Sequence, residues 1–288
     1  MNRIPKPMYD DAGAFQALAS NHRLESHPRL QPIVATILAS YSQYAAVSGN
    51  PAHVQNQAIH AELGKFLKGH YASPPKDLLH ITTLRESSEH RVCPMCGSMH
   101  GGTLDHYLPK NAYPIFSVFS LNLVPACKCN SKRKETLTGP NHNERVLHPY
   151  FDDCLGQRLI KAKFEDLGKV PRVTVVLAVP ATHPDYAAIA FHFRKIVQKT
   201  AIQRYVADRW SNLCRKPSLA VRALERNIDD PAELQRELQK ELNLLDDQFG
   251  GKNNWNSVFV SGLLEPPVME WLRQRLSSAG RQPDAPLI

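Results

Sequence analysis

Apolar residues between positions 30 and 44 recur every three or four residues, with polar residues between them. This period places the apolar side chains on one side of a helix, so it predicts an amphipathic helix. Two early prolines oppose helix, and residues 1–10 are expected to form an extended arm. A second helix is expected over residues 54–66. We therefore expect residues 1–82 to form an N-terminal helical region, and its pattern indicates no particular chemistry.

The last part of the chain opens with a different pattern. Residues 160–164 alternate apolar and basic, as a half-buried strand does, and residues 173–179 are apolar and rich in valine. Helical periodicity follows over residues 186–214, 231–247 and 266–276. We expect residues 151–288 to form a mostly helical α+β region with one pair of short strands.

Composition indicates a folded protein with a mild preference for polyanions. The chain has 288 residues, of which 42% are hydrophobic and 22% charged, too apolar for a chain that stays disordered. Its formal net charge is +8, and the sharpest local excess lies between Lys128 and Lys134. No apolar run approaches the roughly 18–20 residues of a membrane span, and the start does not resemble a secretory signal. We therefore expect a cytoplasmic protein with no membrane partner.

Four of the six cysteines form two close pairs, Cys93 with Cys96 and Cys127 with Cys129. A disulfide scaffold would be denser in cysteine and would require an oxidising compartment. Paired thiolates in a reducing compartment indicate a metal site, and four of them suit a tetrahedral structural Zn²⁺. The two remaining cysteines are expected to be small buried side chains.

An acidic residue and a histidine, Asp105 and His106, stand side by side between the two cysteine pairs. They belong to a predicted short strand over residues 103–108, where adjacent side chains project to opposite faces or splay at a bulge. A carboxylate can bind a hard divalent cation, and a neutral imidazole can act as a general base. Hydrolysis of a phosphodiester needs both an activated water and neutralisation of the charge on the departing oxygen.

Over residues 93–150 the order of these features resembles the HNH endonucleases, also called ββα-metal nucleases, in their zinc-stapled form. The segments that carry the likeness read CPMC, LDHYLPK, NLVPACKCN and HNERVLHPY. The resemblance implies that Asp105 binds a catalytic Mg²⁺ or Mn²⁺ and that His106 is the general base. It implies that Asn122 orders the loop between two strands and that Asn130 is the second metal ligand. The second cysteine pair is one residue shorter than is usual in the family.

The resemblance also implies contacts between basic side chains and DNA phosphates. The candidates are Lys110, Lys128, Lys132, Arg133 and Lys134. A solvated run of charge is the alternative for the last three, which follow Asn130 in the expected helix of the motif. His148 either belongs to the site or bonds the backbone beside a proline. The nuclease core is expected to span residues 83–150.

The predicted protein is thus an α+β HNH nuclease that cuts DNA, with flanking regions that select the substrate or partner. Proteins of this build resemble nucleases of bacterial anti-phage or restriction systems, some paired with an ATPase. One ββα-metal site cuts one strand, so a double-strand break requires a homodimer or two events. One alternative is a non-catalytic zinc-ribbon module for DNA binding or assembly. Another is a thiol redox protein that uses the first cysteine pair, but the presence of a second pair suits zinc better.

Overall fold

The computed structural model describes residues 1–87, 92–100, 102–168 and 170–288. Its helices are α1 (Asp11–Ser20), α2 (Val34–Ala46), α3 (Ala61–Ala72), α4 (Leu79–Glu86), α5 (Cys129–Lys132), α6 (Tyr186–Lys195), α7 (Ile202–Arg215), α8 (Pro231–Gln248), α9 (Trp255–Leu263) and α10 (Pro266–Leu276). Its strands are β1 (Thr103–His106), β2 (Leu123–Ala126), β3 (Ile160–Glu165) and β4 (Arg172–Leu177). They form two separate antiparallel pairs, β1 with β2 and β3 with β4. The mixture of helices with small antiparallel sheets makes the protein α+β, as predicted.

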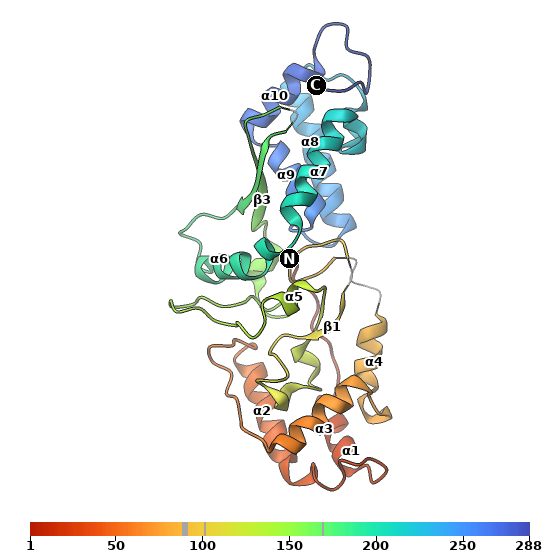
Figure 1. The fold of residues 1–288 in the computed structure, drawn as a ribbon, viewed down its shortest axis with the longest axis vertical. Coiled ribbons are helices and arrows are strands. Elements are labelled where there is room, and N and C mark those ends of the chain that lie inside the picture. The colour runs from red at the N-terminus through yellow and green to blue at the C-terminus, as the bar shows by residue number, and fades with distance from the viewer. Residues whose placement is uncertain (88–91, 101, 169) are drawn as a thin grey trace.

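The molecule is elongated, with β1 and α5 near its middle (Figure 1). Helices α1 to α4 gather at one end and α7 to α10 at the other. A continuous cluster of buried apolar side chains runs through both ends and the middle. The expected boundaries near residues 82 and 150 stay predictions. Among the described residues, no helix has both the length and the apolar character needed to cross a membrane.

The amphipathic helix expected near residues 30–44 is confirmed as α2. Its buried side includes Ile37, Tyr41 and Tyr44. The Tyr41 ring stacks on Phe119 with the ring centroids 4.0 Å apart, and the Tyr44 ring lies 5.1 Å from that of Phe116. Both phenylalanines belong to the segment between β1 and β2. The N-terminal helices therefore support the loop that joins these two strands.

The helix expected over residues 54–66 is misplaced, because α3 begins only at Ala61. Contacts with distant segments hold the preceding residues out of helix. Asn56 donates a hydrogen bond to the Ala112 carbonyl at 2.8 Å, and the backbone N–H of Gln55 donates to the side chain of Gln43 at 3.2 Å. These contacts tie residues 55 and 56 to other segments of the chain ahead of the helix.

The strands expected near residues 160–164 and 173–179 are confirmed as β3 and β4. Their register pairs Ile160 with Leu177 and Phe164 with Val173. Helix α9 packs on β3, α7 packs on β4, and α8 packs on α9. The Trp210 ring lies 4.6 Å from that of Phe164, so aromatic contacts fill the interface between helices and strands.

Two features of the C-terminal helices differ from expectation. The helix expected over residues 186–214 is divided into α6 and α7, because Thr200 is extended and its hydroxyl accepts a hydrogen bond from Ile202 N at 3.3 Å. Helix α9 was not expected at all. Almost every side chain in it is buried, so it shows no alternation between apolar and polar faces.

The N-terminal arm is extended, as expected, and lies against the middle of the molecule. The backbone N–H of Asn2 donates to the Pro94 carbonyl at 3.0 Å, and that of Ile4 donates to the Pro149 carbonyl at 3.0 Å. Both side chains are buried. The arm therefore joins the first cysteine pair to the end of the expected nuclease core.

Candidate metal centre and active site

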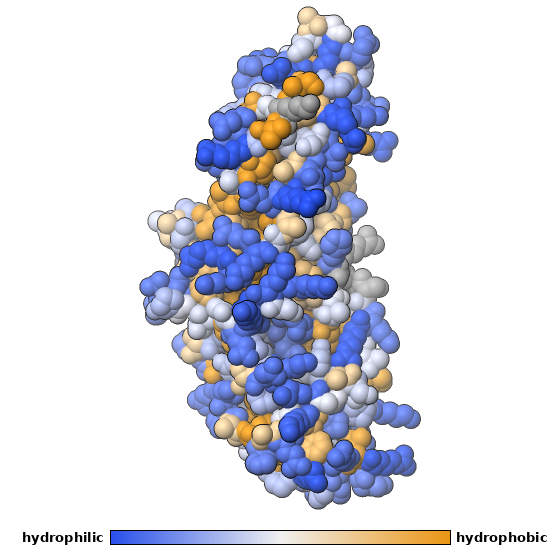
Figure 2. Space-filling model, in the orientation of Figure 1, coloured by the Kyte–Doolittle hydropathy of each residue, from blue (hydrophilic) through white to orange (hydrophobic). Residues whose placement is uncertain are grey.

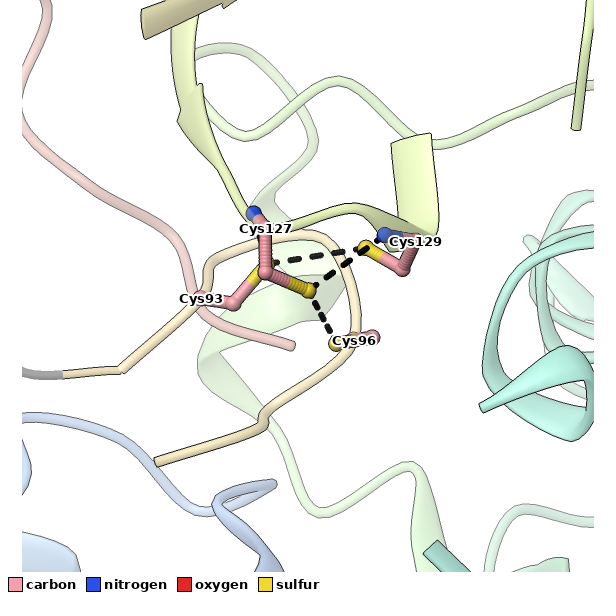
Figure 3. Close-up of side chains that lie close together, drawn as sticks. All are labelled: Cys93, Cys96, Cys127 and Cys129. Carbon is pink, nitrogen blue, oxygen red and sulfur yellow. Dashed lines mark hydrogen bonds between the residues drawn. The ribbon is translucent and has the colours of Figure 1, made fainter. Parts of the chain in front are cut away.

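The four paired cysteines lie together, with all four sulfur atoms within 4.8 Å of one another (Figure 3). The sulfurs of Cys93 and Cys129 are 3.6 Å apart, and those of Cys96 and Cys127 are 3.5 Å apart. A tetrahedral zinc ion with Zn–S bonds of about 2.3 Å would place its sulfurs about 3.8 Å apart. The four residues could therefore hold a zinc ion, and the short Cys-x-Cys pair closes the cluster.

Backbone amides support this cluster from the second pair. The N–H of Cys127 points at the sulfur of Cys93 at 3.3 Å, and the N–H of Cys129 points at the sulfur of Cys127 at 3.4 Å. These N–H groups favour the thiolate forms of Cys93 and Cys127, and the thiolate is the form that binds metal.

The first cysteine pair is held by the C-terminal region. The indole N–H of Trp255 donates to the Cys96 carbonyl at 2.9 Å, and His192 Nε2 donates to the Met95 carbonyl at 2.7 Å. Gly97 has a φ of 79°, in the left-handed region where other side chains are strained. The candidate metal centre thus joins the β1–β2 segment to the C-terminal helices.

Strand β1 separates the side chains of the Asp-His pair onto its two faces. Thr103 and Asp105 face outward, whereas Leu104 and His106 face the interior. The Asp105 side chain is 32% exposed, and that of His106 is 3% exposed. The alternation of a strand explains this arrangement.

The imidazole of His106 has a defined tautomer. Its Nε2 lies 2.9 Å from the carbonyl oxygen of Ser117, and a carbonyl can only accept a hydrogen bond. Nε2 therefore carries the proton, and Nδ1, 4.0 Å from Asp105 Oδ1, keeps its lone pair. Burial lowers the pKa of His106 to about 4. The ring is consequently neutral at pH 7, which a general base requires.

Tyr71 of α3 also positions His106, and sequence reasoning did not find it. Its ring lies 4.2 Å from that of His106, and its hydroxyl donates to the Leu104 carbonyl at 2.5 Å. Its spacing from Leu67 indicates only a buried helix face. No local signal connects it with residues more than thirty positions later in the chain.

Asn122 orders the loop that connects β1 with β2. Its fully buried side chain accepts a hydrogen bond from Leu108 N at 2.7 Å and donates to the Leu108 carbonyl at 3.2 Å. It also donates to the Phe116 carbonyl at 3.1 Å. Ser117, whose carbonyl holds His106, is the next residue. The amide of Asn122 therefore fixes the segment that orients the imidazole.

Asn130, in the single helical turn α5, bridges Asp105 and Arg133. Its Nδ2 donates to Asp105 Oδ2 at 2.8 Å, and its Oδ1 accepts from Arg133 Nε at 2.8 Å. Its Nδ2 also donates to the His106 carbonyl at 3.0 Å, so the amide presents its nitrogen to Asp105 and its oxygen to Arg133. For the amide oxygen to bind a cation beside Asp105, the amide would have to turn over, which would break these three hydrogen bonds.

The other predicted residues divide between interior and surface. Arg133 is 2% exposed, and its guanidinium donates to the carbonyls of Tyr107 and Thr136. His148 is fully buried, with Nε2 2.9 Å from the Tyr44 hydroxyl. The side chains that reach the surface are those of Lys110, which is half-buried, and of Lys128, Lys132 and Lys134, which are exposed.

The candidate catalytic groups line a hollow of about 200 Å³. Its lining includes Asp105, His106, Lys110, Asn130, Arg133 and Lys134. Two carboxylates, those of Asp105 and Glu135, therefore share one surface depression with a neutral imidazole, an arginine and two lysines. Such a set can bind a cation and an anion side by side and can accept a proton between them.

Comparison with known proteins gives one partial likeness. No family model matches the chain, and no solved structure matches it. The chain is similar to Protein ea31 of Escherichia phage lambda, with 43% identity over 63 residues. This stretch is 21% of the present chain and 21% of the phage protein, so the chain spans about a fifth of the length of that relative.

Proposed function

We propose that this protein is a metal-dependent endonuclease of the HNH, or ββα-metal, kind that hydrolyses phosphodiester bonds in DNA. The observation that carries the proposal is the tautomer and position of the His106 imidazole. Its Nε2 is bound to the Ser117 carbonyl, and its Nδ1 lone pair lies beside Asp105 in a hollow with basic residues. This arrangement suits an imidazole that removes a proton from water next to a bound phosphate.

The four polar residues Asp105, His106, Asn122 and Asn130 each have a role in this proposal. His106 Nδ1 accepts the proton of the attacking water, while the Ser117 carbonyl keeps the ring in place. Asp105, with Asn130 beside it, would hold Mg²⁺ or Mn²⁺. A bound divalent cation neutralises charge on the scissile phosphate and the departing oxygen. Asn122 fixes the loop that supports the imidazole.

Charge around the hollow supports a polyanionic substrate. Hydrophilic side chains gather over the middle of the molecule, on the face where α5 and α6 lie (Figure 2). Lys110 and Lys134 line the hollow, and Lys128 and Lys132 are exposed close by on α5 or next to it. Lysines at this surface can bind phosphates and release counterions. The cytoplasmic location, the role in anti-phage defence, a partner ATPase and a homodimer remain parts of this proposal.

The proposal is tested by replacing each of two buried histidines and comparing the cleavage rates of the two variants. The assay is plasmid cleavage with Mg²⁺ or Mn²⁺. His106 Nε2 donates to the Ser117 carbonyl, and His80 Nε2 lies 3.1 Å from the neighbouring Val118 carbonyl. His106→Ala and His80→Ala therefore remove similar support from one loop. We expect His106→Ala to lose roughly 10²–10⁴ in cleavage rate, because the general base is absent, and His80→Ala to retain cleavage.

Two metal-site variants complete the test. Asp105→Ala and Asn130→Ala should be inactive through weaker ion binding, and high Mg²⁺ should restore part of the activity of Asn130→Ala but none of His106→Ala. Full activity in His106→Ala would show that another residue is the general base. A zinc-loaded protein that binds DNA and cuts none would instead be the non-catalytic zinc-ribbon module.

A further inference from the structure

A second hollow lies on the other side of α5 from the candidate active site. It has a volume of about 540 Å³, within the roughly 300–1,000 Å³ of ligand-binding clefts. Lys128 and Lys132 line it, whereas Asn130 and Arg133 line the active-site hollow. The short helix therefore contributes side chains to both hollows.

Strand β1 connects the same two hollows. Thr103 lines the larger one and Asp105 lines the active-site hollow, and both face outward from the strand. Residues two apart on a strand are separated by about 7 Å. A nucleic acid strand that follows the outward face of β1 can therefore place one nucleotide in the larger hollow and a neighbouring phosphate at Asp105.

The lining of the larger hollow combines an apolar part with a cationic rim. Trp255 is buried, and its one polar atom, the indole nitrogen, already donates to the Cys96 carbonyl. Its ring, which is 7% exposed, contributes apolar surface to the lining together with three residues of the cysteine cluster. Lys128 and Lys132 are exposed, and none of the described lining residues is acidic. A nucleotide combines a base that has flat apolar faces with an anionic phosphate, so it matches both parts of the lining.

We propose that the larger hollow binds one unpaired nucleotide of the DNA strand that is cut, an inference that rests on the proposed nuclease function. A base in a duplex is stacked on both sides and must be unpaired or flipped out to enter a pocket. The preferred substrate is therefore DNA with a single-stranded nucleotide beside the scissile phosphate. The C-terminal region supplies Thr200, Ala201 and Trp255 to the lining and thereby takes part in substrate selection.

The test fills the hollow with a bulky side chain. Ala201 is exposed and immediately precedes α7, so Ala201→Trp adds an indole to the hollow without entering the core. Ala181→Trp is the matched control, since Ala181 is exposed in the same region and does not line the hollow. Binding of a short fluorescent single strand and of its duplex is measured without added divalent cation. Zinc content and cleavage of both substrates are measured for each protein.

We expect Ala201→Trp to weaken binding of the single strand by about tenfold or more, because one stacked base contributes about 1–3 kcal/mol. Duplex binding, zinc content and the behaviour of Ala181→Trp should match the wild type. Unchanged single-strand binding by Ala201→Trp, in a protein that still cuts DNA, overturns this inference alone. A wild-type protein that neither binds nor cuts DNA overturns the proposed nuclease function as well.

A second measurement uses the wild-type protein, in case Ala201→Trp disturbs the nearby cysteines. The fluorescent base 2-aminopurine is placed in turn at each position around the cut site. Stacking against the Trp255 side of the hollow should change its fluorescence at one position next to the scissile phosphate. The same fluorescence at every position overturns the inference.

Discussion

Arg133 and Lys134 are adjacent in the chain but have opposite environments. The guanidinium of Arg133 is buried and donates to Asn130 Oδ1 and to backbone carbonyls, whereas Lys134 is exposed. For this run of basic residues the sequence leaves two possibilities, contact with phosphates or a solvated run of charge. The geometry instead gives Arg133 a structural task, which is to hold Asn130 and the end of β1. Under the proposed function, contact with DNA is therefore expected from the lysines.

The salt dependence of DNA binding distinguishes these two roles. Lys134→Gln should reduce the slope of log K against log salt by about 0.9, as expected for one lost phosphate contact. Arg133→Lys should leave that slope unchanged but lower the free energy of unfolding by about 2 kcal/mol, because buried hydrogen bonds are lost. Binding titrations at several salt concentrations and urea unfolding measure both effects. A reduced slope for Arg133→Lys would assign this residue to the DNA surface.

At the scale of elements, the strands β1 and β2 have only four residues each, and α5 is a single turn. Elements this short do not persist alone in water. The cysteine cluster lies where β2 runs into α5, and the first cysteine pair is bound to the C-terminal region. A metal ion in the cluster would therefore fix these short elements with respect to one another.

Replacement of single cysteines tests the metal centre. Cys96→Ser should lower the zinc content of the purified protein and destabilise it strongly, since a structural zinc contributes its binding free energy to folding. Cys214→Ser is the control, because Cys214 is buried in α7 and lies outside the cluster. Zinc is measured by elemental analysis and unfolding by circular dichroism. Wild-type protein that contains no zinc and resists a chelator would refute the zinc site.

At the scale of the whole molecule, several buried histidines occupy the core. Burial lowers the pKa of His148 well below its ordinary value, and it lowers the pKa of His192 to about 4. His192 holds the first cysteine pair, and His148 lies between Tyr44 and Tyr150. Both rings are neutral in the folded protein at pH 7. The fold therefore depends on histidines that stay uncharged.

These pKa shifts predict a loss of stability in mild acid. Below about pH 6.5 the unfolded chain takes up protons on these histidines, and the folded protein does not, so the free energy of unfolding falls. Each histidine contributes at most about 1.4 kcal/mol per pH unit. His148→Gln keeps hydrogen-bonding groups but cannot titrate, so its stability should fall less steeply between pH 7 and 5.5. Urea unfolding at both pH values measures the difference, and parallel curves would contradict it.

The sequence by itself determined the features that depend on local periodicity and spacing. The apolar period predicted α2, and the alternating or valine-rich stretches predicted β3 and β4. The two cysteine pairs predicted one cluster, and alternation in β1 predicted opposite directions for Asp105 and His106. Local patterns succeed here because they record which side of an element faces the core.

Only the tertiary structure decided what each candidate side chain touches. The carbonyl that orients His106 and the ring of Tyr71 come from other segments, and the bonds of Arg133 depend on how α5 packs against β1. Helix α9 and the delayed start of α3 likewise follow from packing and from bonds to distant residues. Contacts between segments far apart in the chain arise from the packing of whole elements, and no local period encodes them.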